Sequence, residues 1–163
     1  IQIDKDLNLS KNLKKTSITI GPGSYTSLRV GAAFISGLYI SKNLLFSPFF
    51  IHDLIKLETS TNSIEKTAIY LSSGNNQKYI CILKKNMQSK YFKAEENVNP
   101  ILSTIETIFY NTEKIDLSSN KFNQFKFSII DVFIKNINNL SFKKNLIIRP
   151  IYVSNNKILN WQK

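Results

Sequence analysis

A strand, a glycine-rich turn and a long helix follow one another near the start of the chain, and this unit constrains the fold more than any other feature. The strand is predicted at residues 16–20, TSITI, because β-branched residues recur there. Neither a helix nor a strand interior tolerates the GPG sequence that follows, so the chain must turn. Ser24 or Thr26 is a good cap for a helix over residues 27–42. The residues of this motif turn are Gly21, Pro22, Gly23, Ser24, Thr26 and Arg29.

Strand and helix patterns alternate through the rest of the chain, which predicts an α/β fold with a mixed sheet. We expect a strand at 43–47 that Pro48 ends, and a helix at 99–111 that Pro100 opens. Residues 67–85 are typical of a hairpin around the turn GNNQ. The other elements are expected as helices at 2–9, 49–58 and 131–140, strands at 91–96 and 150–153, and either strand or helix at 125–130.

The strand–turn–helix unit has the shape of a phosphate cradle but lacks the sequence of the known nucleotide motifs. Free N–H groups at the start of a helix, with the helix dipole behind them, attract anions. A P-loop requires GxxxxGK[ST], and no lysine stands at that position. The Rossmann pattern GxGxxG fits at Gly21 and Gly23 but has Thr26 at its third glycine. The glycines either shape a tight turn, which we favour, or leave a weak anion cradle.

The helix predicted at 27–42 is apolar on two opposite faces, and only Arg29 and Lys42 in it are charged. A surface helix is polar on one side, so we expect this helix to be covered by its own lobe and by a partner; the alternative is a helix wholly inside the domain. Small residues at Ser27/Gly31 and Ala33/Gly37 would let another helix come close. At 100° per residue, one face holds Leu28, Ala32, Ile35 and Tyr39, and the other holds Val30, Ala33, Phe34, Gly37 and Ile40. The predicted partner interface is Leu28, Gly31, Ala32, Ala33, Phe34, Ile35, Gly37 and Tyr39.

The formal charge of the chain is +11, from 22 lysines and arginines against 11 acids. Such an excess attracts nucleic acid, because phosphate neutralisation releases counterions. The abundance of Lys, Asn and Ile is also what AT-rich codons produce, so nucleic-acid contact and compositional bias both remain open. The basic residues form no single long run; they include Lys14, Lys15, Lys42, Lys56, Lys84, Lys85, Lys143 and Lys144.

The single cysteine and single histidine exclude several classes of site. Cys81 cannot form an internal disulfide or a thiolate zinc site, and its apolar strand context favours a buried thiol. His52 is expected to pack or cap rather than to catalyse. The acids have no metal-ligand spacing, so neither a metal nor a cofactor is expected. These dispersed acids are Asp53, Glu58, Glu65, Glu95, Glu96 and Asp131.

No secretory signal or membrane span is predicted. The longest uncharged helical stretch, residues 30–41, is shorter than the roughly 20 residues that cross a bilayer. We therefore expect a cytoplasmic protein with no membrane contact.

Arg29 is one of only two arginines in the chain. It lies in the first turn of the predicted helix, where the helix dipole disfavours a cation. An arginine in a lysine-rich chain suggests a need for the planar guanidinium fork. We expect a carboxylate or several carbonyl groups to bind this side chain.

The sequence GPGSYTSLRVGAAFISGLYISKNL resembles the GPGSFTGLRIG…GL motif of the TsaB family, also called YeaZ. The resemblance continues at TAIYLSSGNNQKYICIL, which is similar to the strand–turn–strand of the family, and ends at RPIYVSNNKILNW, which is similar to its closing Pro-Val-Tyr-Leu-Arg segment. These landmarks occur in the order of the family and span nearly the whole chain.

The resemblance implies the actin-like ATPase (RNase H-like) fold, an α/β fold of two lobes with mixed sheets and flanking helices. It implies a non-catalytic subunit that binds a TsaD-like transferase, which transfers a threonylcarbamoyl group to the tRNA adenosine next to the anticodon. A TsaE-like ATPase joins them, tRNA is reached through the complex, and a homodimer is possible. We expect a partial N-terminal lobe at 1–47, with the partner-binding helix at 27–42, and a C-terminal lobe at 48–163.

The sequence departs from the family at several positions. The opening strand with Ile-Asp-Thr-Ser and its hairpin are absent, so the N-terminal lobe is expected to be incomplete, through truncation or degeneration. The family's Asp-Ala-Arg corresponds to Ser72, Ser73 and Gly74, and its final Leu-Arg to Val153 and Ser154. Two other functions stay open: an actin-like nucleotide-binding enzyme, such as a kinase or peptidase, and a direct RNA-binding protein.

Overall fold

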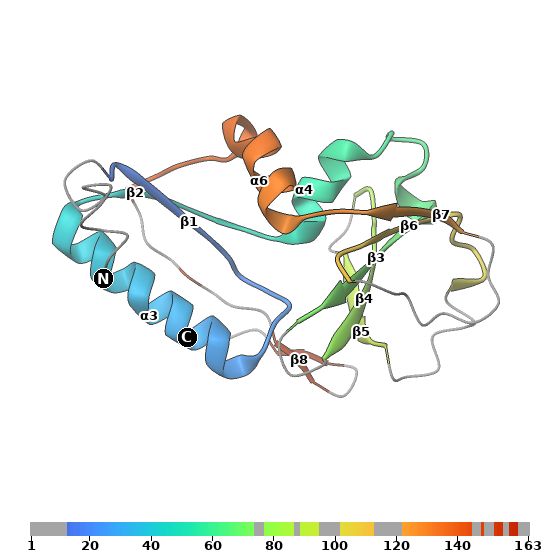
Figure 1. The fold of residues 1–163 in the computed structure, drawn as a ribbon, viewed down its shortest axis with the longest axis horizontal. Helices are drawn as coiled ribbons and strands as arrows, with labels where there is room; N and C mark the ends of the chain where they lie inside the picture. The colour runs from blue at the N-terminus through green and yellow to red at the C-terminus, as the bar shows by residue number, and fades with distance from the viewer. Residues whose placement is uncertain are drawn as a thin grey trace.

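The structure, a computed structural model, describes residues 13–73, 77–86, 89–94, 102–112, 122–144, 148, 152–154 and 157–159. It is an α/β fold in which helices flank three sheets, as the sequence predicts (Figure 1). The predicted helix at 2–9 and most of the turn GNNQ lie outside the described residues. The strands are β1 (Lys15–Thr19), β2 (Leu45–Phe49), β3 (Thr67–Ser72), β4 (Lys78–Ile82), β5 (Lys90–Lys93), β6 (Thr107–Tyr110), β7 (Asn123–Lys126), β8 (Tyr152–Ser154) and β9 (Lys157–Leu159). The helices are α3 (Tyr25–Lys42), α4 (Ile51–Glu58), α6 (Ile129–Asn136) and the short 3-10 helices η1 (Ile64–Lys66) and η2 (Ile137–Asn139).

Strand β1, helix α3 and strand β2 form one βαβ unit, in which the two strands pair in parallel and α3 runs alongside them (Figure 1). This β1–α3–β2 unit confirms the predicted strand–turn–helix. The prediction that Pro48 ends the strand is wrong, because β2 continues to Phe49. The N–H of Phe46 points away from β1, to the carbonyl of Lys143 at 2.8 Å. Pro48, two residues on, faces the same outer side, so its missing N–H costs no bond to β1.

A five-stranded mixed sheet of order β5-β4-β3-β6-β7 forms the larger part of the fold. The predicted hairpin is confirmed, since β3 and β4 are antiparallel, although β4 ends at Ile82 rather than at residue 85. β3, β6 and β7 run parallel. Strands and helices alternate because parallel neighbours require crossover connections. The lobe boundary after residue 47 stays a prediction.

The predicted helix at 99–111 is wrong over its second half, which is strand β6 paired in parallel with β3. Leu102, Ile105 and Ile108 do follow a helical spacing, and all are buried in one cluster. The spacing arises because a turn at Leu102–Ile105 and a β-branched strand bury their apolar residues on the same face of the sheet. Tertiary pairing with β3 overrides the local pattern here.

Both faces of the five-stranded sheet carry a hydrophobic core. On one face, Ile51 and Ile55 of α4 pack against Cys81 and Leu83, and residues of α6 close the layer. On the other face, Leu102 and Ile105 cover the sheet. The sheet is therefore the most completely buried part of the described chain, and α4 and α6 lie between it and the β1–α3–β2 unit (Figure 1).

Candidate functional site: the outer face of helix α3

The motif turn sets the direction in which α3 leaves β1. Gly21 has a φ of 125°, a backbone conformation that favours glycine, and its peptide bond to Pro22 is cis. Ser24 is the cap of α3: its Oγ accepts from the N–H of Ser27 at 3.1 Å. Thr26, the other predicted cap, is an exposed residue of the first helical turn. The glycine and the cap thus explain this sequence as a turn that starts a helix.

One face of α3 packs inside the chain. Leu28 and Ile35 are buried there, while Ala32 and Tyr39 are half-buried. A Cβ on Gly31 would lie 2.8 Å from Cδ1 of Ile18 in β1, so the missing side chain of Gly31 allows α3 to approach its own strand. The expectation that Gly31 leaves room for a second helix is therefore replaced by a role within the β1–α3–β2 unit.

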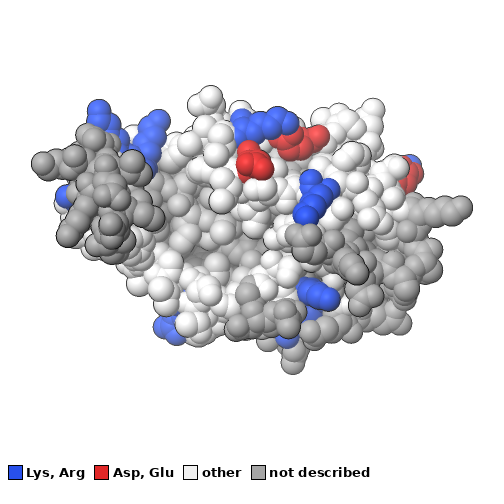
Figure 2. Space-filling view, viewed as in Figure 1, with Lys and Arg blue, Asp and Glu red and all other residues white. Residues whose placement is uncertain are grey.

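The opposite face of α3 is apolar and open to solvent. Val30 is 63% exposed, Phe34 58% and Ile40 81%, and Ala33 and Gly37 between them are also exposed. No described atom comes within 4 Å of a Cβ built on Gly37. We call Val30, Ala33, Phe34, Gly37 and Ile40 the outer face of α3. Uncharged residues dominate the surface along the lower left in Figure 2, where α3 runs.

The predicted interface residues divide between these two faces. Ala33, Phe34 and Gly37 belong to the outer face, and the structure brings them together there. Val30 and Ile40 were not among the predicted interface residues, although the 100° helical rotation places them on the same face. The predicted residues that pack on the inner face or at its edge are Leu28, Gly31, Ala32, Ile35 and Tyr39.

Arg29 interacts with Tyr25, one helical turn before it. Its Nη1 donates to the Tyr25 hydroxyl at 2.7 Å, and its guanidinium carbon lies 4.9 Å from the centre of the Tyr25 ring. Both side chains are exposed. Tyr25 thus provides both a hydrogen-bond acceptor and a π face to this cation, and the expected carboxylate or carbonyl partner stays a prediction.

The residues with the most familiar catalytic chemistry are buried under α4 instead. His52 Nδ1 is hydrogen-bonded to the Tyr91 hydroxyl, and its Nε2 lies 3.3 Å from Oδ1 of Asp53. Burial, with a smaller contribution from Lys56, lowers the pKa of His52 to about 3. Burial also raises the pKa of Cys81 to about 12. A neutral imidazole and a protonated thiol in the core stabilise packing and are poor general bases or nucleophiles at neutral pH.

A hollow of about 320 Å³ lies between α4, α6 and the β6–β7 edge. Phe109 and Phe125 stack in it, with ring centres 5.4 Å apart. Glu58 at its rim pairs with Lys135 and accepts from Asn136 Nδ2 at 2.7 Å, and these partners lower the pKa of Glu58. The Glu58 carboxylate thus links α4 to α6 through its contacts with Lys135 and Asn136. Within the described residues, no group of three His, Cys, Asp or Glu side chains is placed to hold a metal ion.

No helix in the described part of the chain is long and apolar enough to cross a bilayer. The outer face of α3, an apolar surface exposed to solvent, is the strongest candidate for a binding site.

Comparison with known proteins agrees with the motif. The model of the family described as TsaD, tRNA N6-adenosine threonylcarbamoyltransferase, matches residues 2–151. No curated protein matches the sequence. A structure named YeaZ from Pseudomonas aeruginosa is 14% identical with a TM-score of 0.37, and the match covers 56% of this chain and 47% of that one. A second, named an uncharacterized protein with similarity to peptidase YEAZ from Pseudomonas aeruginosa, is 10% identical with a TM-score of 0.48, and covers 91% of this chain and 80% of that one.

Proposed function

The chain belongs to the TsaD family of tRNA N6-adenosine threonylcarbamoyltransferases, and we propose that within it the chain is a docking subunit without catalytic activity of its own. The family match and the mixed α/β architecture confirm the actin-like fold class predicted from the sequence. The TsaB-like motif GPGSYTSLR favours the role of the partner subunit over that of the transferase.

The outer face of α3 carries this proposal. Each large apolar side chain that moves from water into an interface contributes roughly 1.5–3 kcal/mol, and Val30, Phe34 and Ile40 stand next to one another with most of their surface in water. Ala33 and Gly37 between them leave a shallow track along which a helix of the partner can approach closely. A TsaD-like transferase subunit docks on this face.

The buried chemistry of the chain supports a non-catalytic role. Its only histidine is held in the core by Tyr91, and its only cysteine is a buried thiol. The motif turn has no lysine at the P-loop position. The further partners of the complex are a TsaE-like ATPase and tRNA bound through the assembly, all in the cytoplasm.

Paired substitutions on two helices test the docking site. Phe34→Ser/Ile40→Ser changes the outer face of α3, and Ile130→Ser/Ile134→Ser changes an apolar ridge of α6 that is similarly exposed, at 68% and 61%. We expect the α3 variant to weaken binding of the TsaD-type subunit at least about 30-fold, as loss of about 2 kcal/mol or more at an interface centre does. The α6 variant should bind within about threefold of the unsubstituted chain. Isothermal titration calorimetry gives the affinities, and thermal melting shows that each variant is folded.

Two results would contradict the proposal. The first is docking that survives the α3 variant and fails in the α6 variant, which would move the interface to α6. The second is binding of ATP by the purified chain with a micromolar Kd, which would favour the nucleotide-binding enzyme.

A further inference from the structure

The fold gathers lysines that lie far apart in the sequence. Lys14 and Lys15 stand at the start of β1, Lys42 is in the last turn of α3, and Lys143 and Lys144 follow α6 and η2. We call these five residues the lysine end. Leu45 N donates to the carbonyl of Lys14 at 2.9 Å, which brings the start of β1 beside the start of β2, directly after Lys42.

Backbone contacts hold the third segment of the lysine end in place. Phe46 and Lys143 exchange both backbone hydrogen bonds, at 2.8 and 3.0 Å, and the Tyr39 hydroxyl of α3 donates to the carbonyl of Lys144. Lys15 Nζ lies 5.1 Å from the ring centre of Phe142. All five lysine side chains are exposed. Hydrogen bonds thus fix the backbone of the segments that carry the lysines, while the charged groups extend into solvent.

The described residues at the lysine end include no acidic residue. The sequence has no Asp or Glu between Leu7 and His52, and none after Asp131. No described residue forms an ion pair with any of the five lysines, whereas Lys56, Lys66 and Lys135 pair with acids elsewhere. Among the described residues on the face seen in Figure 2, no acidic side chain in red lies at the end that carries the starts of β1 and β2.

Local structure accounts for Lys42 through the helix dipole and for Lys15 through the Phe142 ring, and leaves three of these charges unexplained. A cation in the last turn of a helix is favoured by the helix dipole, and this accounts for Lys42. The dipole acts only within the last turn, so it gives no reason for lysines on β1 and after η2. Like charges in one place repel one another. A polyanion bound at the lysine end would offset that repulsion.

We propose that the lysine end binds the phosphate backbone of tRNA, an inference that rests on the proposed function. Lysines act on phosphates as point charges, so this contact positions the RNA and reads no base. Lys42 and Ile40 both belong to the last turns of α3, so the lysine end lies at the C-terminal end of the helix that carries the outer face.

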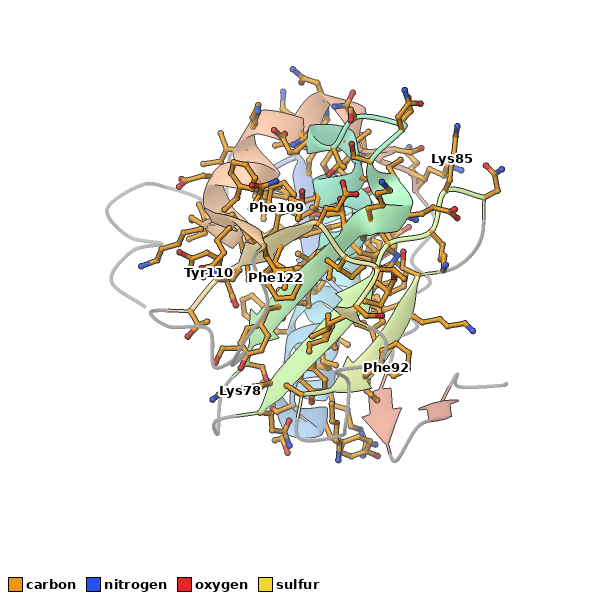
Figure 3. The ribbon with its side chains drawn as sticks, turned by 90° about the vertical axis from the view of Figure 1, so that its right-hand side faces the viewer. Lys78, Lys85, Phe92, Phe109, Tyr110 and Phe122 are labelled. Carbon is orange, nitrogen blue, oxygen red and sulfur yellow. The ribbon has the colours of Figure 1, made fainter. Side chains whose placement is uncertain are left out.

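Charge-neutral variants test the inference on the whole chain with a labelled tRNA transcript. The test variant changes Lys14, Lys15, Lys42, Lys143 and Lys144 to Gln. The control changes five other lysines to Gln and removes the same charge: Lys78, Lys84, Lys85, Lys90 and Lys93. The control lysines lie on or next to β4 and β5, with Lys78 at the start of β4 and Lys85 beyond its other end (Figure 3). Fluorescence anisotropy gives the Kd between about 50 and 200 mM salt, the range in which phosphate contacts change affinity most clearly.

We expect the test variant to raise the Kd at least about tenfold at the lowest salt and to reduce the slope of log Kd against log salt by about 2–4, since each phosphate contact contributes about 0.7–0.9. The control should change the Kd less than about threefold. Equal losses in both variants would overturn the inference, because net charge alone would then explain binding. So would binding to anionic lipid vesicles that the test variant loses while tRNA binding persists.

Two further arrangements keep the result interpretable. Lys143→Gln/Lys144→Gln, in an exposed segment, is measured as well, so that a folding defect of the fivefold variant does not hide the effect. The same anisotropy titration is carried out with and without the TsaD-type subunit. If that subunit does not bind but the lysine-dependent affinity for tRNA remains, the proposed docking is wrong and the proposed binding of tRNA by the lysine end is supported.

Discussion

The five-stranded sheet and the β1–α3–β2 unit differ in how many of their faces the described chain covers. The sheet has a hydrophobic core on both faces, with Ile55, Ile69 and Cys81 fully buried. The β1–α3–β2 unit has two strands, and its helix covers them with one face while the other stays in water.

The charges divide in the same way. Asp53, Glu58 and Glu106 all pair with lysines on α4, η1 and α6. The β1–α3–β2 unit contains no acid at all. We therefore expect the sheet to supply most of the stability, whereas the β1–α3–β2 unit has an apolar face and a basic end that are exposed to solvent. The predictions below test this division.

Truncation of the sheet core should have the largest effect. Ile55→Ala removes a fully buried side chain of α4 and is expected to cost about 3–4 kcal/mol, the usual range for a cavity that cannot collapse. Leu28→Ala on the inner face of α3 is expected to cost about 2 kcal/mol, because the edge of the unit can relax. Chemical denaturation measures both. A larger loss for Leu28→Ala would mean that the β1–α3–β2 unit is the more stable region.

Acid should destabilise the sheet region through His52. The folded-state pKa is lowered from 6.5 to about 3, so below pH 6.5 the unfolded chain binds a proton that the folded chain does not. Stability is therefore lost as the pH falls from 6.5 towards 3, by about 2 kcal/mol between pH 7 and pH 5 from this group. Chemical denaturation at pH 7 and pH 5 should show this loss of stability in the unsubstituted chain and not in His52→Gln. An equal change of unfolding free energy with pH in both chains would mean that the pKa of His52 is not lowered by folding.

Two glycines on α3 should respond differently to the same substitution. Gly37→Ala is expected to stabilise the chain by about 0.5–1 kcal/mol, because alanine favours a helix and the site is open. Gly31→Ala should gain nothing, since Ile18 must move away from the new methyl group. The expected difference is about 1 kcal/mol in thermal or chemical unfolding. Equal gains would show that α3 does not approach β1 through Gly31.

Arg29→Lys should have the smallest effect. Lysine keeps the charge but contacts the Tyr25 hydroxyl and ring less well, and exposed cation–π pairs contribute about 0.5–1 kcal/mol. We expect Arg29→Lys to lower the unfolding free energy by about 0.5 kcal/mol, and to lower it by less in a Tyr25→Leu background. An equal loss with and without Tyr25 would mean that the contact with Tyr25 does not distinguish arginine from lysine.

The local features of the fold were predictable from the sequence. Gly21 and Pro22 specify a turn whatever surrounds them, and Ser24 caps the helix through its own neighbours. β6 was not predictable, because Leu102, Ile105 and Ile108 suit a helix until β3 is present to pair with them. The prediction that Pro48 ends the strand was wrong for a related reason. Only the pairing of Phe46 with Lys143 shows that Pro48 lies on the side of β2 that faces away from β1, where its missing N–H costs no bond to β1.

The candidate site likewise has one part that could be predicted from local sequence and one part that depends on the fold. The apolar outer face of α3 follows from a helical rotation of 100° per residue, so Phe34 and Gly37 could be selected from the sequence. The lysine end could not, because Lys42 and Lys143 are brought together only by a bridge between β2 and the segment after η2. Residues that form no run in a sequence can still form one surface in the fold.

Thiol labelling in the presence of the TsaD-type subunit tests the central claim most directly. The chain has one cysteine, and its burial and raised pKa, about 12, make it unreactive, so an introduced cysteine reports alone. Gly37→Cys places a thiol on the outer face of α3, and Ile130→Cys places one on α6. We predict that saturating partner slows labelling of Gly37→Cys at least about tenfold and changes Ile130→Cys by less than about twofold. Unchanged labelling of Gly37→Cys by a partner that is demonstrably bound would contradict the account.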